Sequence, residues 1–574
     1  MWDKEELDKI REARKRWEEG PLKQSLDRFG IQESPFKVYT PLDVENHDFL
    51  KQVGFPGQPP YTRGLYPMPV PESATRGDTR APAGAYAGYG TVEDTRDLWR
   101  KERRRGANVA FDLPTQCGYD SDDPMSRGEV GKVGVAVSTL QDFETLYEAF
   151  DGIVTLDNMS SNWTINGLAN VILAMYIAIA EKKGIPESKL RGTPQNDILK
   201  EFVARGTANF PVDPSMRMVR DTITYVSKNM PQMNAISICG FHMREMGATA
   251  AQINAFVYAN AIAYVQLGVD AGLNPDVFVP RHFTLLNSGG SMDFFMEIAR
   301  IRSSRRMWPK IMRERFNSKN PRAWFMRSVD QASVGYISTT KQRAINNLTR
   351  GIIGGVAAAL SGGMPNGGVP FDEPLGLGHS YEAQQLSLDA ARIMRYEARL
   401  GEVLDPLAGS YYVESLTDQV EEESWEIMKK IDEMGGAVEA VRSGWMEREI
   451  TKSAYAFQRE VESGKRVIVG VNRFTGEHEL DMTPHIPRLV PYPYDPAKRA
   501  RAEEVQIAKL AKIRKERDND RVKYALNDLQ EAAKNEKENL IPHLITTVKT
   551  YATIGEITNA LREVFGDYEP LNVL

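Results

Sequence analysis

The sequence predicts an α/β protein: a (β/α)8 TIM barrel with an N-terminal extension and a helical C-terminal region. Between about residues 90 and 400, short apolar runs that end in polar or glycine-rich clusters alternate with longer helical stretches, a pattern typical of βαβ units and a parallel sheet. The alternation repeats roughly six to eight times, which favours a closed barrel over the alternative, an open doubly wound sheet. After about residue 415 the composition becomes helical and charged.

The barrel prediction depends on individual strands and helices. We predict strands over Asn108–Leu113, Gly152–Leu156, Ala235–Cys239 and Asp276–Pro280, with a further short strand in 467–474. Long apolar stretches at 168–184 and 251–268 predict helices between them. In a barrel the carboxyl ends of all strands lie on one face, so we expect the polar clusters that follow the strands to form an active site there.

We divide the chain into an N-terminal helical arm (1–50), the barrel (51–415) and a mainly helical C-terminal region (416–574). Residues 1–30 are highly charged, which is typical of a surface or partner-facing helix. Residues 54–84 are rich in Gly, Pro, Tyr and Arg, so this segment is either a disordered linker or an ordered, extended segment that lies over a ligand.

Composition excludes several classes of protein. The 574 residues include 72 Lys and Arg and 78 Asp and Glu, a net charge of −6, so we expect no nucleic-acid partner. Two cysteines, Cys117 and Cys239, exclude a disulfide framework and a four-cysteine zinc site, and they suit a reducing cytoplasm. The N-terminus lacks a signal-peptide pattern, and no apolar run reaches the length of about 20 residues that spans a bilayer, so we expect no membrane segment.

The local motifs of many enzymes are missing. The chain has no GxxxxGK[ST], no GxGxxG after a strand, no GxSxG, no HExxH and no CxxC. No two histidines have the spacing of helical metal ligands, so we predict no metal site in this chain. If the protein is an enzyme, a bound cofactor is expected to carry the difficult chemistry.

Three polar clusters are candidate sites. In the first, 192–207, Asn196 or Asp197 could cap the next helix, and Arg205 could be either a surface arginine or a fork aimed at a substrate carboxylate. In the second, His242 follows an apolar strand and a glycine, where a structural and a functional histidine are both plausible. The third is Tyr86 in a glycine-rich stretch, which alone is a weak signal.

These clusters belong to longer segments that resemble the methylmalonyl-CoA mutase family. The segments are PPYTRGLYP (59–67), AYAGYGTVEDT (85–95), VAFDLPTQCGYDSDDP (109–124), GTPQNDILKEFVARGT (192–207), SICGFHMREMGATA (237–250) and DPLAGSYYVE (405–414). The resemblance extends over about 50–570 and implies a barrel closed at its top by adenosylcobalamin, with the pantetheine arm of an acyl-CoA along its axis. The chain has no D-x-H-x-x-G cobalt-ligand motif. It therefore resembles the large subunit of a split mutase that shares its cofactor with a small cobalamin-binding subunit; a chaperone GTPase is a further partner that the family allows.

The resemblance also assigns roles to residues. Tyr86 resembles the tyrosine that wedges against the cofactor and contacts the substrate carboxylate, and Arg205 resembles the arginine that pairs with this carboxylate. His242 resembles the histidine that hydrogen-bonds the thioester carbonyl. Gln195 resembles a substrate-binding glutamine, and Glu373 resembles the glutamate at the adenosyl ribose. The other expected substrate-binding residues are Tyr66, Arg63, Ser161, Thr164 and Arg281, and the other expected cofactor-binding residues are Gln116 and Gln331.

The chain departs from the family pattern around the acyl site. Residues 72–85 and 361–369 are rich in small residues, and Phe241 stands where a tyrosine is common, which suggests a roomier pocket. Tyr86 and Arg205 together indicate a dicarboxylic acyl-CoA of the methylmalonyl-CoA/succinyl-CoA type, with or without a bulkier substituent. The alternatives are a mutase for a branched or hydroxylated monocarboxylic acyl-CoA, a non-catalytic binding or scaffold relative, and a cobalamin-independent CoA lyase.

Overall fold

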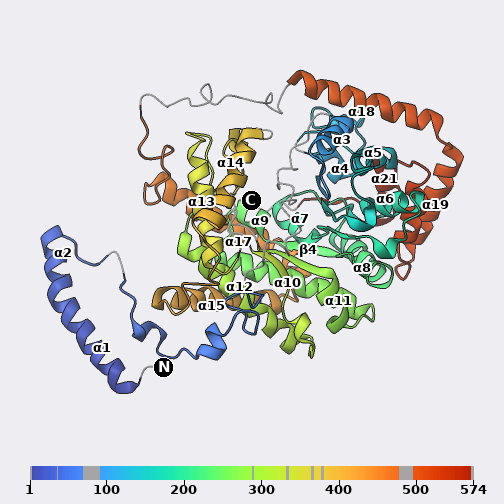
Figure 1. The fold of residues 1–574 in the computed structure, drawn as a ribbon. Coiled ribbons are helices and arrows are strands. Elements are labelled where there is room, and N and C mark those ends of the chain that lie inside the picture. The colour runs from blue at the N-terminus through green and yellow to red at the C-terminus, as the bar shows by residue number, and fades with distance from the viewer. Residues whose placement is uncertain are drawn as a thin grey trace.

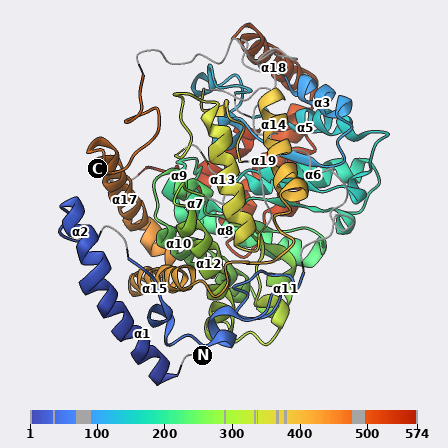
Figure 2. The same ribbon diagram turned by 60° about the vertical axis from the view of Figure 1, so that its left-hand side comes forward.

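A parallel β-sheet surrounded by helices forms the centre of the molecule (Figures 1 and 2). In the computed structural model the described residues are 3–34, 37–68, 91–132, 134–287, 290–330, 335, 337–363, 368–375, 381–476 and 496–570. The six described strands are β1 (Ala107–Ala110), β2 (Ser161–Thr164), β3 (Gly192–Pro194), β4 (Ile236–Cys239), β5 (Phe283–Asn287) and β6 (Arg327–Asp330).

The strands pair in chain order, and every pair is parallel. β1, β2 and β3 form one ladder, and β4, β5 and β6 form another. The Ser237 amide donates to the Gln195 carbonyl at 2.9 Å, which connects the two ladders between β3 and β4. Sequential parallel strands need crossover connections, and helices supply them. The predicted α/β class with a parallel sheet is confirmed, whereas closure into an eight-stranded barrel stays a prediction.

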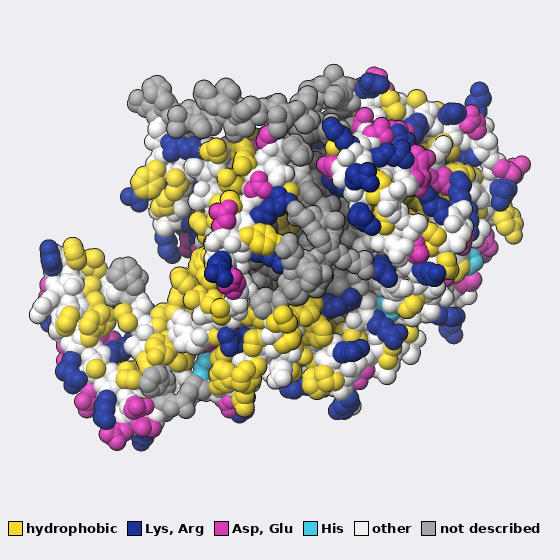
Figure 3. Space-filling view, viewed as in Figure 1, with side chains coloured by type: hydrophobic (Ala, Val, Ile, Leu, Met, Phe, Trp, Pro, Cys, Tyr) yellow, Lys and Arg dark blue, Asp and Glu magenta, His cyan; other side chains and the backbone are white. Residues whose placement is uncertain are grey.

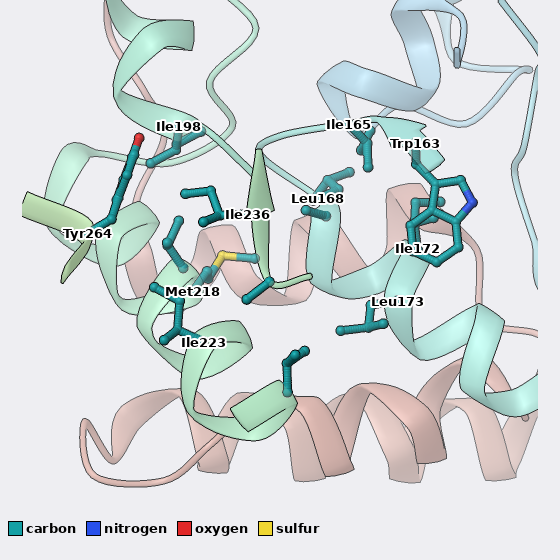
Figure 4. Packing of buried hydrophobic residues seen from close by; sticks show 14 of the residues in the cluster. Trp163, Ile165, Leu168, Ile172, Leu173, Ile198, Met218, Ile223, Ile236 and Tyr264 are labelled. Carbon is teal, nitrogen blue, oxygen red and sulfur yellow. The ribbon is translucent and has the colours of Figure 1, made fainter. Parts of the chain in front are cut away.

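The helices between the strands are long and strongly buried. They include α5 (Leu140–Tyr147), α6 (Ala169–Lys182), α8 (Val212–Asn229), α10 (Ala250–Asp270) and α12 (Phe294–Arg315). Every residue from Ala169 to Ala180 in α6 is buried, because C-terminal helix α20 (Ile541–Val548) covers α6 on the side away from the sheet. Trp163, Leu168 and Ile172 illustrate this packing (Figure 4). The C-terminal helices therefore complete the hydrophobic core around the sheet.

Shorter helices and the C-terminal region surround this layer. They are α3 (Val92–Lys101), α4 (Leu113–Cys117), α7 (Ile198–Ala204), α9 (Phe241–Glu245), α11 (Pro275–His282), α13 (Asn346–Leu360), α14 (Tyr381–Arg392), α15 (Tyr411–Glu433), α16 (Ala437–Arg442), α17 (Trp445–Glu462), α18 (Pro496–Glu516), α19 (Asn519–Lys534) and α21 (Ile554–Phe565). α15 packs against α10 and α12. Where α18 and α19 lie, basic and acidic side chains intermingle on the surface (Figure 3). Within the described ranges, no helix has both the length and the apolar composition of a membrane span.

The N-terminal arm projects away from this body (Figures 1 and 2). It consists of α1 (Lys4–Trp17) and α2 (Lys23–Phe29), joined by one π-helical turn. Leu7 is the one buried residue that α1 contains, and α2 contains none. The expected surface character of residues 3–30 agrees with this exposure.

Two predicted strands were wrong in position. Gly152–Leu156 forms turns, and strand β2 begins later, at Ser161. Asp276–Pro280 lies in helix α11, and the strand follows at Phe283. Asn274 explains the helix, because its side chain caps the Asp276 amide at 2.9 Å while a proline stands at the first helical position.

The predicted strand in 467–474 was also wrong. It contains only an isolated bridge between Val469 and Arg473. The Asn472 side chain accepts from the Ile468 amide and donates to the Arg466 carbonyl, which folds the segment back on itself. A side chain that satisfies the backbone locally competes with strand pairing.

Candidate active site

The two faces of the sheet differ in chemistry. Val109, Trp163 and Ile238 point into the helix layer and are at most 2% exposed. The alternate residues point to the other face, and they are small and polar and partly exposed: Asn108, Asn162, Thr164, Thr193, Ser237 and Thr284. The strand register aligns Asn108, Asn162 and Thr193 side by side. Most TIM barrels fill the corresponding face with bulky branched residues, whereas the side chains here are small and polar.

His242 lies at the carboxyl end of β4, in the first turn of α9. The imidazole Nδ1 is buried and has no hydrogen-bond partner. Burial, followed by the positive charges of Lys200 and Arg205, lowers the pKa of His242 well below its usual value. The ring is therefore neutral near pH 7, and it can exchange a hydrogen bond with a ligand.

Helix α7 packs against α9, which carries His242 (Figure 1), and the charge of Arg205 at the end of α7 acts on this histidine. Gln195 lies on the segment between β3 and α7. Gln195 is 5% exposed, and its Oε1 accepts hydrogen bonds from Asn166 and Lys200 at 3.0 Å each. Arg205 ends α7, and its guanidinium lies 3.5 Å from the Glu201 carboxylate. The structure thus brings together three residues that the sequence singled out: a glutamine, an arginine and a histidine.

Asp197 occupies the N-cap position of α7, as one interpretation of the sequence held, but its side chain makes no capping hydrogen bond. Its carboxylate accepts from the Tyr264 hydroxyl at 2.7 Å and from the Cys239 amide at 2.9 Å. Burial is the largest influence on the pKa of Asp197, which is raised. Asn196 adopts φ 55° and donates to the Ala235 carbonyl at 3.1 Å. Both side chains fix the segment after β3 against β4 and α10, which holds Gln195 in place.

Thr164, Ser161 and Arg281 are placed differently from one another. Thr164 lies on the polar face, where its hydroxyl donates to the Val109 carbonyl at 3.2 Å. Ser161 is fully buried and points to the same face of β2 as Trp163, which packs on the helix layer. A ligand on the polar face therefore does not contact Ser161. Arg281 is exposed and precedes β5, at the end of the sheet opposite to His242. The sequence placed it after a strand because α11 was mistaken for that strand.

The remaining predicted residues form no single cluster. The Gln116 side chain is buried, and its amide donates to the Phe111 carbonyl at 2.6 Å. Arg63 is half-buried and donates to the Leu404 carbonyl at 3.1 Å, and Tyr66 is 46% exposed. Glu373 is half-buried in a short turn, Glu373–Leu375. Tyr86 and Gln331 lie outside the described residues.

The cofactor candidates can be tested against the chemistry of their donors. Glu373 supplies carboxylate oxygens, which accept from ribose hydroxyls, and Gln116 retains an amide oxygen beyond its bond to Phe111. Their oxygens are acceptors of the chemical type that a nucleoside-bearing cofactor requires. In the described part of the chain, no three His, Cys, Asp or Glu side chains form a metal-binding group.

Sequence reasoning missed four buried residues around Gln195. They are Asn166, Lys200, Glu201 and Thr207, each at most 7% exposed. A charged Lys–Glu pair within the apolar helix ILKEFVA was the available signal.

Comparisons with known proteins identify the family of the chain. The family model for methylmalonyl-CoA mutase matches residues 31–567. The chain is 37% identical over 535 residues to the 2-hydroxyisobutanoyl-CoA mutase large subunit of Aquincola tertiaricarbonis, covering 93% of this chain and 91% of that protein. It is 38% identical over 535 residues to methylmalonyl-CoA mutase of Escherichia coli, covering 92% and 71%. It is 37% identical over 526 residues to the human mitochondrial methylmalonyl-CoA mutase, covering 90% and 66%. The chain therefore belongs to the methylmalonyl-CoA mutase family, whose members are cobalamin-dependent isomerases of acyl-CoA thioesters.

Proposed function

We propose that this chain is the large, acyl-CoA-binding subunit of an adenosylcobalamin-dependent mutase that rearranges the carbon skeleton of a dicarboxylic acyl-CoA. The observation that carries the proposal is the cluster of Gln195, Arg205 and His242 at the carboxyl ends of parallel strands. Active sites of barrel enzymes lie at this end. The partly exposed polar face below the cluster supports a path for the pantetheine arm.

Each residue of the cluster has a definite role in this proposal. Neutral His242 hydrogen-bonds the thioester carbonyl, and its low pKa keeps it from carrying a charge beside two cations. Arg205 binds the substrate carboxylate, because its planar fork matches a carboxylate in a two-point contact. Gln195 donates from its amide to the acyl group. When bound, adenosylcobalamin would supply the radical chemistry, with Glu373 and Gln116 as its candidate contacts, and such chemistry needs a site closed to water.

The partner and the compartment are also proposals. We propose that a separate small subunit binds cobalamin and shares it with this chain. The support is that the chain covers 91% of a relative named as a large subunit but 71% of the E. coli mutase. A chaperone GTPase stays a further candidate partner. Cytoplasmic location is supported by two free cysteines, Cys117 and Cys239.

A second candidate function has one observation in its favour. The relative that this chain covers to 91% acts, by its name, on 2-hydroxyisobutanoyl-CoA, a hydroxylated monocarboxylic acyl-CoA. Arg205 favours the dicarboxylic class, because its guanidinium keeps donors beyond the one long contact with Glu201 and can bind a carboxylate in a two-point contact.

The decisive experiment is turnover with the completed enzyme. The chain is combined with a cobalamin-binding small subunit and adenosylcobalamin, then given methylmalonyl-CoA, succinyl-CoA and 2-hydroxyisobutanoyl-CoA, with product isomers separated by chromatography. Isomerisation of a dicarboxylic acyl-CoA is expected. Turnover of the hydroxylated substrate alone would support the second candidate. Turnover without cobalamin would support a lyase. If no acyl-CoA is isomerised, a binding or scaffold role is the function that remains.

A further inference from the structure

Lys200 is completely buried beside the candidate site, an uncommon position for a lysine. It lies on α7 with 0% of its surface exposed. Its ammonium donates to Gln195 Oε1 at 3.0 Å and forms an ion pair with Glu201, which is also fully buried. A buried ion pair is weak evidence for stability, because desolvating both charges offsets their attraction. The pair therefore calls for another explanation.

The first part of the explanation is the orientation of the Gln195 amide. An ammonium group can only donate hydrogen bonds, so the atom that faces Lys200 must be the amide oxygen. Asn166 Nδ2 donates to the same oxygen at 3.0 Å, and Asn166 is itself held because its Oδ1 accepts from the Asp197 amide at 2.9 Å. Two donors on Oε1 leave the Nε2 group turned away from Lys200. The glutamine thus offers a ligand a donor and not an acceptor.

The second part is the environment of Glu201. Its carboxylate accepts hydrogen bonds from Asn166, Lys200 and Thr207. Burial acts to raise the pKa of Glu201, but the Lys200 and Arg205 charges outweigh it and lower that pKa, so the carboxylate is ionised. Arg205 Nη1 lies 3.5 Å from Oε1 of this carboxylate. A single long contact orients the guanidinium while leaving its other donors available.

We propose that Lys200 and Glu201 are positioning residues: Lys200 holds Gln195 as a hydrogen-bond donor to the acyl group, and Glu201 aims Arg205 at the substrate carboxylate. This inference rests on the proposed function. Neither residue touches the substrate in this scheme. Each acts through a neighbour, so its effect must disappear when that neighbour is removed.

A double-mutant cycle tests the coupling between Lys200 and Gln195. The variants are Lys200→Met, Gln195→Ala and the pair together, and the measurement is binding of succinyl-CoA to the full chain by titration calorimetry. We expect each single variant to weaken binding about tenfold, as for the loss of one hydrogen bond to a ligand. We expect the pair to bind about as weakly as Gln195→Ala alone. Independent, multiplying losses would overturn the role of Lys200, because they would show that it does not act through the glutamine.

Turnover separates positioning from a general structural effect. In the assembled holoenzyme, Lys200→Gln keeps a donor near Gln195 Oε1 and is expected to recover part of the activity that Lys200→Met loses. Glu201→Gln is expected to reduce kcat/KM more for a dicarboxylic than for a monocarboxylic acyl-CoA, because it acts through Arg205. Equal losses for both substrates, or no recovery with Lys200→Gln, would contradict the proposal.

Controls distinguish misfolding and failure of the proposed function. Lys182→Met removes an exposed lysine of α6 that pairs with Glu144, and it is expected to leave binding unchanged. If Lys200→Met alone does not fold, because it leaves the Glu201 charge unpaired, the cycle is run in the Glu201→Gln background, so that Lys200→Met/Glu201→Gln is compared with Glu201→Gln. If the wild-type chain binds no acyl-CoA, the proposed function itself fails. If the wild-type chain binds acyl-CoA but the affinity losses of Lys200→Met and Gln195→Ala are independent, only the positioning role is refuted.

Discussion

Replacing Arg205 with glutamine is the most direct test of the substrate class. The side chain ends α7, is 23% exposed and has one described ion-pair partner, Glu201 at 3.5 Å. Its other donors are therefore available to a substrate carboxylate next to Gln195 and His242. Arg205→Gln keeps a polar side chain but removes the charge and the two-point fork.

The expected loss follows from the burial of the group that would remain. Removing one partner of a buried ion pair costs about 3–5 kcal/mol, because the other charge is left uncompensated. Arg205 is partly exposed, so water relieves some of this cost, and we expect about 3 kcal/mol for a dicarboxylic substrate. At about 1.4 kcal/mol for each factor of ten, kcat/KM should fall roughly 100-fold. A monocarboxylic acyl-CoA has no free carboxylate that could pair with Arg205, so its kcat/KM should change less than about threefold.

The assay compares kcat/KM of the assembled enzyme for succinyl-CoA and for 2-hydroxyisobutanoyl-CoA. Arg205→Lys retains the charge without the fork and should restore part of the loss for succinyl-CoA alone. Arg220→Gln is the matched control: Arg220 is 28% exposed on α8 and pairs with Asp221, but it lies outside the candidate site. Equal losses for both substrates with Arg205→Gln would refute the reasoning and show that the arginine is structural.

Three further predictions concern stability. The pKa of His242 in the folded chain lies far below its unfolded value near 6.5, so the unfolded chain binds an extra proton and the free energy of unfolding falls as the pH drops below about 6.5. His242→Gln should remove up to about 1.4 kcal/mol of this loss per pH unit, measured by urea unfolding from pH 7.5 to 5. Tyr264→Phe deletes the hydroxyl that donates to Asp197 at 2.7 Å and should lower the free energy of unfolding by about 1–3 kcal/mol at pH 7; an unchanged urea midpoint would contradict this. Phe143→Ala empties a fully buried site and should cost about 3–5 kcal/mol, whereas Tyr524→Ala, at a side chain 76% exposed, should cost less than about 0.5 kcal/mol in the same titration.

The parallel α/β fold could be predicted from the sequence because long apolar helices alternate with short apolar runs. The positions of two strands could not be predicted in this way. Gly152–Leu156 and Asp276–Pro280 contain β-branched residues like a strand, but a cap at Asn274 makes the second a helix. Strand β2 was hidden because its residues Ser161 to Thr164 are mostly polar. A strand with one polar, ligand-facing side loses the apolar signal that sequence reasoning uses.

Part of the candidate site could likewise be predicted from the sequence, and part could not. Gln195, Arg205 and His242 could be found because they follow strands and lie in segments that resemble the family. Lys200 and Glu201 were missed, although they stand in an otherwise apolar helix, since adjacent charged residues on a helix usually face solvent. Only the packing shows that α7 is enclosed, with Leu199 and Phe202 buried on either side of the pair. Which face Ser161 takes could not be predicted either, because no strand was predicted over Ser161 to Thr164 and successive residues of a strand point to opposite faces.

The polar face of the sheet also explains why the outer layer is so heavily packed. A sheet face of small polar side chains forgoes the hydrophobic burial that most barrels obtain from bulky residues on that face. The protein compensates outside, where α6 is buried along twelve consecutive residues between the sheet and α20. The core that contains Phe143, Trp163 and Tyr176 continues without a break into the C-terminal helices. The apolar core and the small polar side chains therefore lie on opposite sides of the same strands, and Phe143→Ala is expected to lower the free energy of unfolding without changing which acyl-CoA the enzyme prefers.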